Sequence, residues 1–81
     1  MLSSTRKRIC KVLTRAMWYV QCGSDLARAV QEAKWELESQ EWVWGQFPES
    51  VAVNPFAASS GLTKTEALLL LREAHTRLMS T

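Results

Sequence analysis

Apolar residues recur every three or four positions along the first part of the chain. This spacing places them on one face of an α-helix, and the positions are Ile9, Val12, Leu13, Ala16, Met17 and Val20. A serine at position 3 or 4 can cap the first turn. Gly23 can adopt the left-handed conformation that ends a helix. The pattern predicts a helix over about residues 5–22.

A second helix is predicted over about residues 24–44, with Ser24 as its cap. Its inward positions are Leu26, Ala29, Val30, Ala33 and Leu37. Gly45 and Pro48 would end it. Because the junction between the two predicted helices is so short, we expect them to fold back on each other as an antiparallel hairpin.

Charge is distributed unequally between these two helices, although the net charge of the chain is only +2. The first carries Arg6, Lys7, Arg8, Lys11 and Arg15, and the second carries Asp25, Glu32, Glu36, Glu38 and Glu41. Cations at a helix N-terminus and anions at a C-terminus both oppose the helix dipole. An antiparallel hairpin brings these two ends together, so the charges favour that arrangement, while apolar burial drives it.

The remaining segment predicts one short and one long helix. Asn54 followed by Pro55 is typical of a helix start, which places a short helix near residues 55–60. Thr63 and Glu66 form a capping box at the start of a C-terminal helix over about residues 64–79. Four consecutive leucines put apolar groups on more than one side of that helix, so we expect it to be central or shared with a second copy. Residues 1–81 thus predict a single all-α domain.

No residue constellation predicts catalysis, a cofactor or a metal site. His75 is the only histidine, and zinc sites need three or four converging ligands. Cys10 and Cys22 would lie about 18 Å apart along one helix, too far for a disulfide. We therefore expect a reduced, cytoplasmic, non-enzymatic protein that does not enter membranes, since no apolar run is long enough. The acid-free start also resembles an organellar presequence, which is an alternative.

The chain is rich in tryptophan, and most of it lies in one segment. Three of the four tryptophans, Trp35, Trp42 and Trp44, fall within ten residues. Trp35 and Trp42 would form a second line on the second helix, seven residues apart. Phe47, Val51, Val53 and Phe56 are expected to cover part of that flank. A chain of this length cannot easily bury every indole, so we expect a partner or a second copy to cover the rest.

The predicted contact residues combine these indoles with the basic helix. Trp35, Trp42 and Trp44 would anchor a partner, since tryptophan and arginine dominate the energy of interfaces. Arg8, Lys11 and Arg15 would attract an acidic surface on that partner. A homodimer whose tryptophans form its core is the simpler alternative.

Residues 57–67 resemble the turn of helix-turn-helix DNA-binding regulators. A small residue, Ala57, precedes Gly61 by four positions, and a capped helix follows. The resemblance implies that Thr63, Lys64 and Thr65 face bases or phosphates in the major groove. A small DNA-binding transcriptional regulator is therefore the alternative function, and the basic helix could also contact phosphates.

A second resemblance covers residues 8–37. It rests on Trp18, Gly23, Ser24, Ala29, Ala33 and Trp35. Their pattern resembles short orphan helical proteins encoded by bacteriophages and other mobile elements. This implies a small accessory protein that binds and inhibits a host protein in the host cytoplasm, which is our lead hypothesis.

Overall fold

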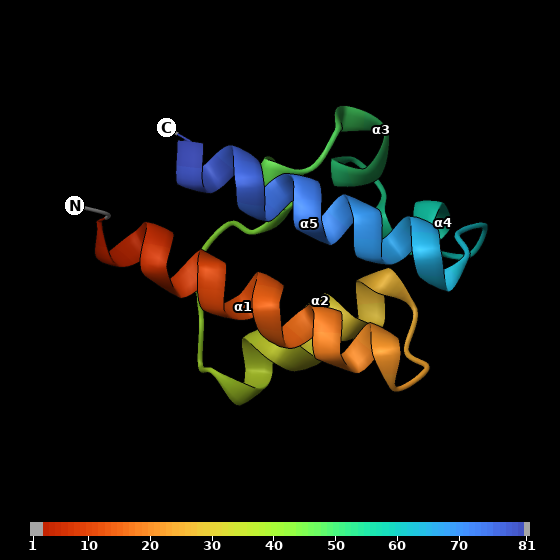
Figure 1. Ribbon diagram of the computed structural model, residues 1–81, viewed down its shortest axis with the longest axis horizontal. Coiled ribbons are helices and arrows are strands. Elements are labelled where there is room, and N and C mark those ends of the chain that lie inside the picture. Colours follow the sequence, from red (N-terminus) through yellow and green to blue (C-terminus); the bar gives the residue numbers. More distant parts are fainter. Residues whose placement is uncertain (1–2, 81) are drawn as a thin grey trace.

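All regular structure in the computed structural model, which describes residues 3–80, is helical (Figure 1). The elements are α1 (Ser4–Gln21), α2 (Leu26–Glu36), the 3-10 helix η1 (Trp44–Gln46), α3 (Glu49–Ala52), α4 (Pro55–Ser59) and α5 (Lys64–Ser80). No β-strand occurs among the described residues. The predicted all-α class is confirmed. None of the helices in this part of the chain has the length and apolar content needed to cross a bilayer.

The predicted antiparallel hairpin is formed by α1 and α2 (Figure 1). Ser3 caps α1 by accepting a hydrogen bond from the backbone N–H of Arg6 at 3.2 Å. Gly23 follows the helix with a φ of 112°, as expected for a glycine that ends a helix. Arg15 pairs with Glu36 and Arg8 pairs with Glu41, so the basic start of α1 lies beside the acidic segment at and after the end of α2.

The second helix is shorter than predicted, because it ends at Glu36 rather than near residue 44. Glu38 adopts a φ of 51°, and the N–H of Ser39 donates to the carbonyl of Lys34 at 2.9 Å. These two features define a Schellman motif in which a glutamate occupies the position usually held by glycine. The cap at the other end is Asp25, not Ser24, since its carboxylate accepts from the N–H of Arg28 at 2.8 Å.

The connection to the last helix contains the predicted short helix, α4, together with η1 and α3, which the sequence did not predict. Asn54 caps α4 by accepting from the N–H of Ala57 at 3.3 Å. The main packing partners of α4 are α2 and α3. The connection therefore bridges the two long helices: α4 packs on α2, and η1 packs on α5.

The capping box that starts α5 is confirmed. The N–H of Thr63 donates to Glu66 Oε1 and the N–H of Glu66 donates to Thr63 Oγ1, both at 3.1 Å. Hydrogen bonding from Thr63, first from its backbone N–H and then from its side chain, lowers the pKa of the Glu66 carboxyl group. From this start, α5 runs antiparallel along α1, so the first turn of α1 and the last turn of α5 lie at the same end of the molecule (Figure 1). Leu71 faces the core, whereas the Leu69 side chain stays exposed.

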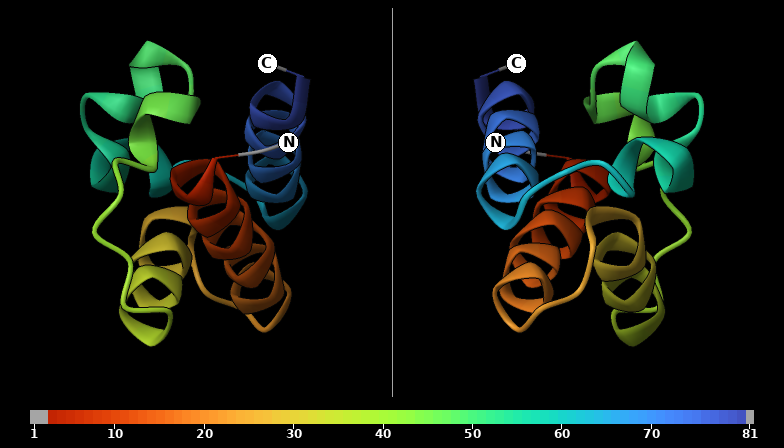
Figure 2. Two further views of the ribbon diagram at one scale, coloured as in Figure 1. Left: turned by 90° about the vertical axis from the view of Figure 1, so that its left-hand side faces the viewer. Right: turned by 90° about the vertical axis from the view of Figure 1, so that its right-hand side faces the viewer.

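The core forms around α1, which lies between α2 and α5 (Figure 2). The largest fully buried side chains are aliphatic: Leu13, Leu26, Leu71, Val12, Val20, Val30 and Val43. None of the four tryptophans belongs to the buried core. Trp44 is partly buried against that core, whereas Trp18, Trp35 and Trp42 are exposed and available to form surfaces.

Candidate binding surfaces

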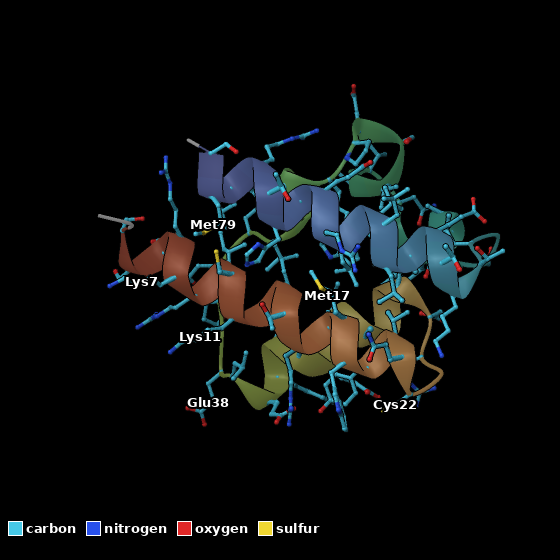
Figure 3. The ribbon with its side chains drawn as sticks, viewed as in Figure 1. Lys7, Lys11, Met17, Cys22, Glu38 and Met79 are labelled. Carbon is cyan, nitrogen blue, oxygen red and sulfur yellow. The ribbon has the colours of Figure 1, made fainter. Side chains whose placement is uncertain are left out.

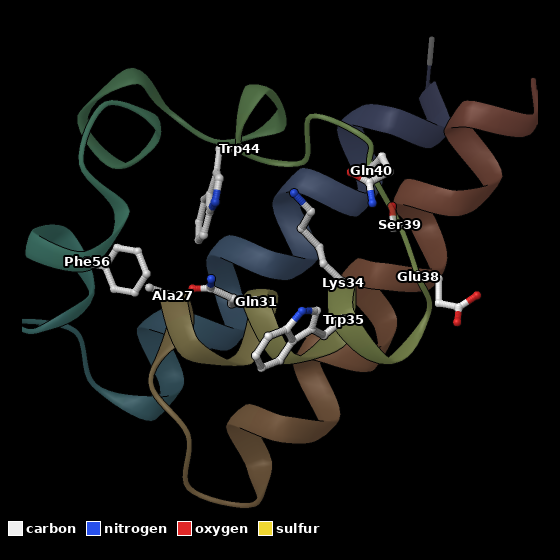
Figure 4. Close-up of a pocket in the computed structure, with 9 residues that line it drawn as sticks. All are labelled: Ala27, Gln31, Lys34, Trp35, Glu38, Ser39, Gln40, Trp44 and Phe56. Carbon is white, nitrogen blue, oxygen red and sulfur yellow. The ribbon is translucent and has the colours of Figure 1, made fainter.

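A groove of about 400 Å³ lies on the outer side of α2 (Figure 4). We call it the α2 groove. Trp35 forms one wall, and Phe56 from α4 and Trp44 from η1 form the others. Gln31 lies between Phe56 and Trp35, and Lys34 projects beside the rings (Figure 4). The groove therefore combines aromatic walls with hydrogen-bonding groups.

The aromatic walls differ in how they are held. Trp35 is 83% exposed and Phe56 is 63% exposed. Trp44 is half-buried, and its ring lies against Phe47 with 5.0 Å between centroids. Phe47 thus covers part of one indole as predicted, but Phe56 does not, because it remains mostly exposed and extends the groove. The prediction that Val53 covers the indoles is also wrong, since Val53 is exposed.

Trp42 lies apart from the α2 groove. Because α2 ends before it, the predicted helical line through Trp35 and Trp42 does not exist. The Trp42 ring is 67% exposed and packs over Gly45, where an added methyl group would collide with it. The structure therefore brings Trp35 and Trp44 into one groove and leaves Trp42 outside it.

A second groove, of about 550 Å³, lies between the outer face of α1 and the C-terminal end of α2. We call it the α1 groove. Trp18, which is 50% exposed, and Leu37, which is 40% exposed, supply its apolar surface. Leu37 was predicted to face inward, which is wrong because the helix ends before it. Trp18 was not among the predicted contact residues, although Lys11, Thr14 and Trp18 recur at helical spacing in the sequence.

Two of the three cations that were predicted to attract an acidic partner, Arg8 and Arg15, are paired with carboxylates of the same chain. Arg15 donates from Nε to both Glu36 oxygens at 3.0 and 3.1 Å, and Tyr19 donates its hydroxyl to the same carboxylate. Arg8 contacts Glu41 at 3.5 Å. Lys11 makes no ion pair with any described residue. Of the three, Lys11 retains a charge that no carboxylate neutralises.

The network around Glu36 also holds an aromatic pair, the half-exposed Trp18 and the partly buried Tyr19. The Arg15 guanidinium lies 4.8 Å from the centroid of the Trp18 ring. Trp18 meets Tyr19 edge to face, with centroids 5.1 Å apart. Hydrogen bonds from Arg15 and Tyr19 lower the pKa of Glu36 from 4.5 to about 2. The indole is thus held on the surface by a defined set of contacts.

Replacing Glu36 with glutamine is expected to reduce the loss of stability in acid. The pKa of Glu36 is lower in the folded chain than in the unfolded chain. Its contribution to the free energy of unfolding is therefore complete above about pH 4.5 and is lost as the pH falls toward 2. Urea unfolding at several pH values in that interval should therefore show a flatter profile for Glu36→Gln than for the parent protein. Glu73→Gln on α5 is the control, since its exposed side chain makes no ion pair with the described residues. Parallel profiles for the parent and Glu36→Gln would contradict the assignment.

The predicted DNA-contacting residues lie at the start of α5. Thr63, Lys64 and Thr65 are exposed. Thr63 uses both its hydroxyl and its amide in the capping box. The preceding helix, α4, has five residues and packs mainly on α2 and α3. This segment therefore begins α5, and its contact with DNA stays a prediction.

Groups with chemical reactivity are few in the described residues. No three histidine, cysteine, aspartate or glutamate side chains within residues 3–80 are placed to hold a metal ion. Cys10 and Cys22 are both free. Burial raises the pKa of the Cys10 thiol, which disfavours the reactive thiolate. Comparison of the chain with protein-family models, curated proteins and solved structures gave no match.

Proposed function

We propose that this chain is a non-enzymatic protein-binding module that contacts its partner through the α2 groove. The observation that carries the proposal is the exposure of Trp35 beside Phe56, on a domain whose core closes without either ring. Each ring offers roughly 150–250 Å² of surface that a partner can cover. Tryptophan at the centre of a contact is the residue type that most often dominates its binding energy.

The polar groups of the α2 groove support recognition of a protein. Gln31, Lys34 and Gln40 line the groove next to the rings, and Gln31 and Gln40 are exposed. Amide and ammonium groups around aromatic anchors can satisfy the backbone and side-chain acceptors of a partner. An aromatic centre with a polar rim is the usual anatomy of a protein interface.

A role as a phage or mobile-element protein that inhibits a host protein belongs to the same proposal. Its support is the sequence resemblance carried by Trp18, Gly23, Ser24, Ala29, Ala33 and Trp35. The partner would then be a host protein. A second copy of the chain is the other candidate occupant, and light scattering after size exclusion separates the two by mass.

The test compares Trp35→Ala with a matched Trp42→Ala variant, in which an exposed tryptophan outside the α2 groove is removed. A protein captured by the parent chain from a bacterial lysate is purified, and its affinity for each variant is measured by calorimetry. We expect Trp35→Ala to weaken binding about 30-fold, which corresponds to about 2 kcal/mol. Trp42→Ala should bind like the parent. Equal affinities for the parent and Trp35→Ala would overturn the use of the α2 groove.

Binding to duplex DNA tests the alternative function. A regulator would bind DNA with an affinity that falls steeply with salt, and Lys64→Glu would abolish that binding. If the chain binds DNA in this way and captures no protein from the lysate, the DNA-binding alternative replaces the proposed function.

A further inference from the structure

One face of α1 carries charge at one end and an aromatic ring at the other. Lys7, Lys11, Thr14 and Trp18 follow one another at helical spacing and are all exposed. Figure 3 shows Lys7 and Lys11 projecting from the same side of the helix. We call these four residues the α1 face, and its C-terminal half forms part of the α1 groove.

The two lysines are the uncompensated cations of this face. Arg8 and Arg15, their neighbours, are paired with Glu41 and Glu36. Lys7 and Lys11 form no ion pair with residues 3–80. Like charges one helical turn apart repel each other, and the N-terminal end of α1 adds its positive dipole. The face therefore presents a positive potential that an anionic partner would neutralise.

The other half of the face is an apolar site that is already ordered. Trp18 is held by Arg15 and Tyr19, and Leu37 lies on the opposite side of the groove. A partner would not have to immobilise the indole on binding. Such preorganisation lowers the entropic cost of association.

We propose that the α1 face binds an acidic amphipathic helix of a partner protein. The lysines are separated by about 6 Å along the helix axis, and Trp18 lies about 10 Å beyond Lys11. A helix lying along α1 matches these intervals with two carboxylates one turn apart and a large apolar side chain two turns further on. The carboxylates meet Lys7 and Lys11, and the apolar side chain enters the α1 groove. This is the helix-in-groove mode of recognition.

The same surface fits other anionic partners less well. Beyond Lys11, the charged groups that line the α1 groove are Arg15 and Glu36, and because these two are paired with each other they offer a phosphate no net charge. Nucleic acid has no aliphatic side chain to fill a groove walled by Leu37 and Trp18. The chemistry therefore favours a peptide that carries both carboxylates and an apolar side chain.

This inference shares with the proposed function the idea of a protein partner, but it uses a different surface. The two can therefore fail separately. Loss of binding in Trp35→Ala concerns the α2 groove, and loss in variants of Lys7, Lys11 or Trp18 concerns the α1 face.

The experiment titrates the whole chain with a synthetic amphipathic helix that has the acidic and apolar spacing given above. The readout is the indole N–H signal of Trp18 in two-dimensional NMR, assigned with Trp18→Phe. We expect this signal to move on titration while the signal of Trp35 stays in place. Reversing both lysines, Lys7→Glu with Lys11→Glu, should weaken binding at least about tenfold. A peptide with lysines in place of its carboxylates should regain affinity for that double variant.

Arg72→Glu is the matched control, because it reverses an exposed cation on α5 and should leave peptide binding unchanged. Lys7, Lys11 and Arg72 are all exposed, and circular dichroism checks that each variant remains folded. A Trp18 signal that does not move at millimolar peptide, or an affinity unaffected by the double reversal, would overturn the proposal. Binding of phosphatidylserine vesicles or duplex DNA that depends on Lys7 and Lys11, without peptide binding, would overturn it in favour of that partner.

Discussion

Replacing Leu13 with alanine is expected to reduce the free energy of unfolding by about 2–5 kcal/mol. Leu13 is fully buried in α1, the helix that packs against both α2 and α5. Removing its branched end leaves a cavity that neither neighbouring helix can close without moving. Total stability in small domains is only about 5–15 kcal/mol, so the change removes a large share of it. Urea unfolding followed by circular dichroism measures the effect.

Leu69→Ala is the control for this prediction because it makes the same chemical change at a position that is 54% exposed. The stability of that variant should stay within about 0.5 kcal/mol of the parent. Similar midpoints for Leu13→Ala and Leu69→Ala would mean that α1 is not the centre of the core. The comparison also tests the packing of α5, whose four consecutive leucines the sequence alone could not assign to a single buried face.

Features that depend on a few neighbouring residues could be predicted from the sequence. The cap at Ser3, the glycine at position 23, and the box formed by Thr63 and Glu66 are all local, and the structure confirms them. Each satisfies backbone groups within one turn of its own helix, so no tertiary information is needed. The all-α class follows from the same local signals together with helical periodicity.

The end of α2 could not be predicted, because it depends on tertiary packing. No glycine or proline lies between Glu36 and Val43, yet Glu38 adopts the left-handed conformation there. Leaving the helix at this point allows Val43 and Phe47 to be buried in the core. The burial of these side chains compensates for the backbone strain at Glu38. The sequence pattern shows only that the segment tends to form a helix, so it could not predict where the helix ends.

The candidate site was predicted only in part, for a related reason. Exposed tryptophans were expected, but which of them share a groove depends on where α2 ends and where α4 packs. Trp35 and Trp44 line the same groove because α4 packs on α2 and, through α3, holds η1 nearby, and Phe56 on α4 adds a third ring. Trp18 was missed because its surface also needs Leu37, whose exposure follows from the early end of α2.

Replacing Ser59 with alanine is expected to cost about 1–3 kcal/mol, because it leaves a buried backbone amide without an acceptor. The Ser59 side chain is buried, and its Oγ accepts from the N–H of Ala27 at 2.9 Å. The same hydroxyl donates to the carboxylate of Asp25 at 3.4 Å. Amides in the first turn of a helix have no partner within that helix. One hydroxyl from α4 therefore completes the start of α2.

This link also positions the α2 groove, since it ties the helix that carries Phe56 to the helix that carries Trp35. In Ser59→Ala, the amide hydrogen of Ala27 should exchange faster with solvent, and the unfolding midpoint in urea should fall. Ser60→Ala is the neighbouring control, because Ser60 caps the C-terminal end of α4, is exposed, and donates its hydroxyl only to the carbonyl of Ala57, at 2.8 Å. Its stability should stay within about 0.5 kcal/mol of the parent. Equal midpoints and equal exchange of Ala27 in the two variants would show that α4 is held by apolar contacts alone, and that Phe56 keeps its place in the groove without this hydrogen bond.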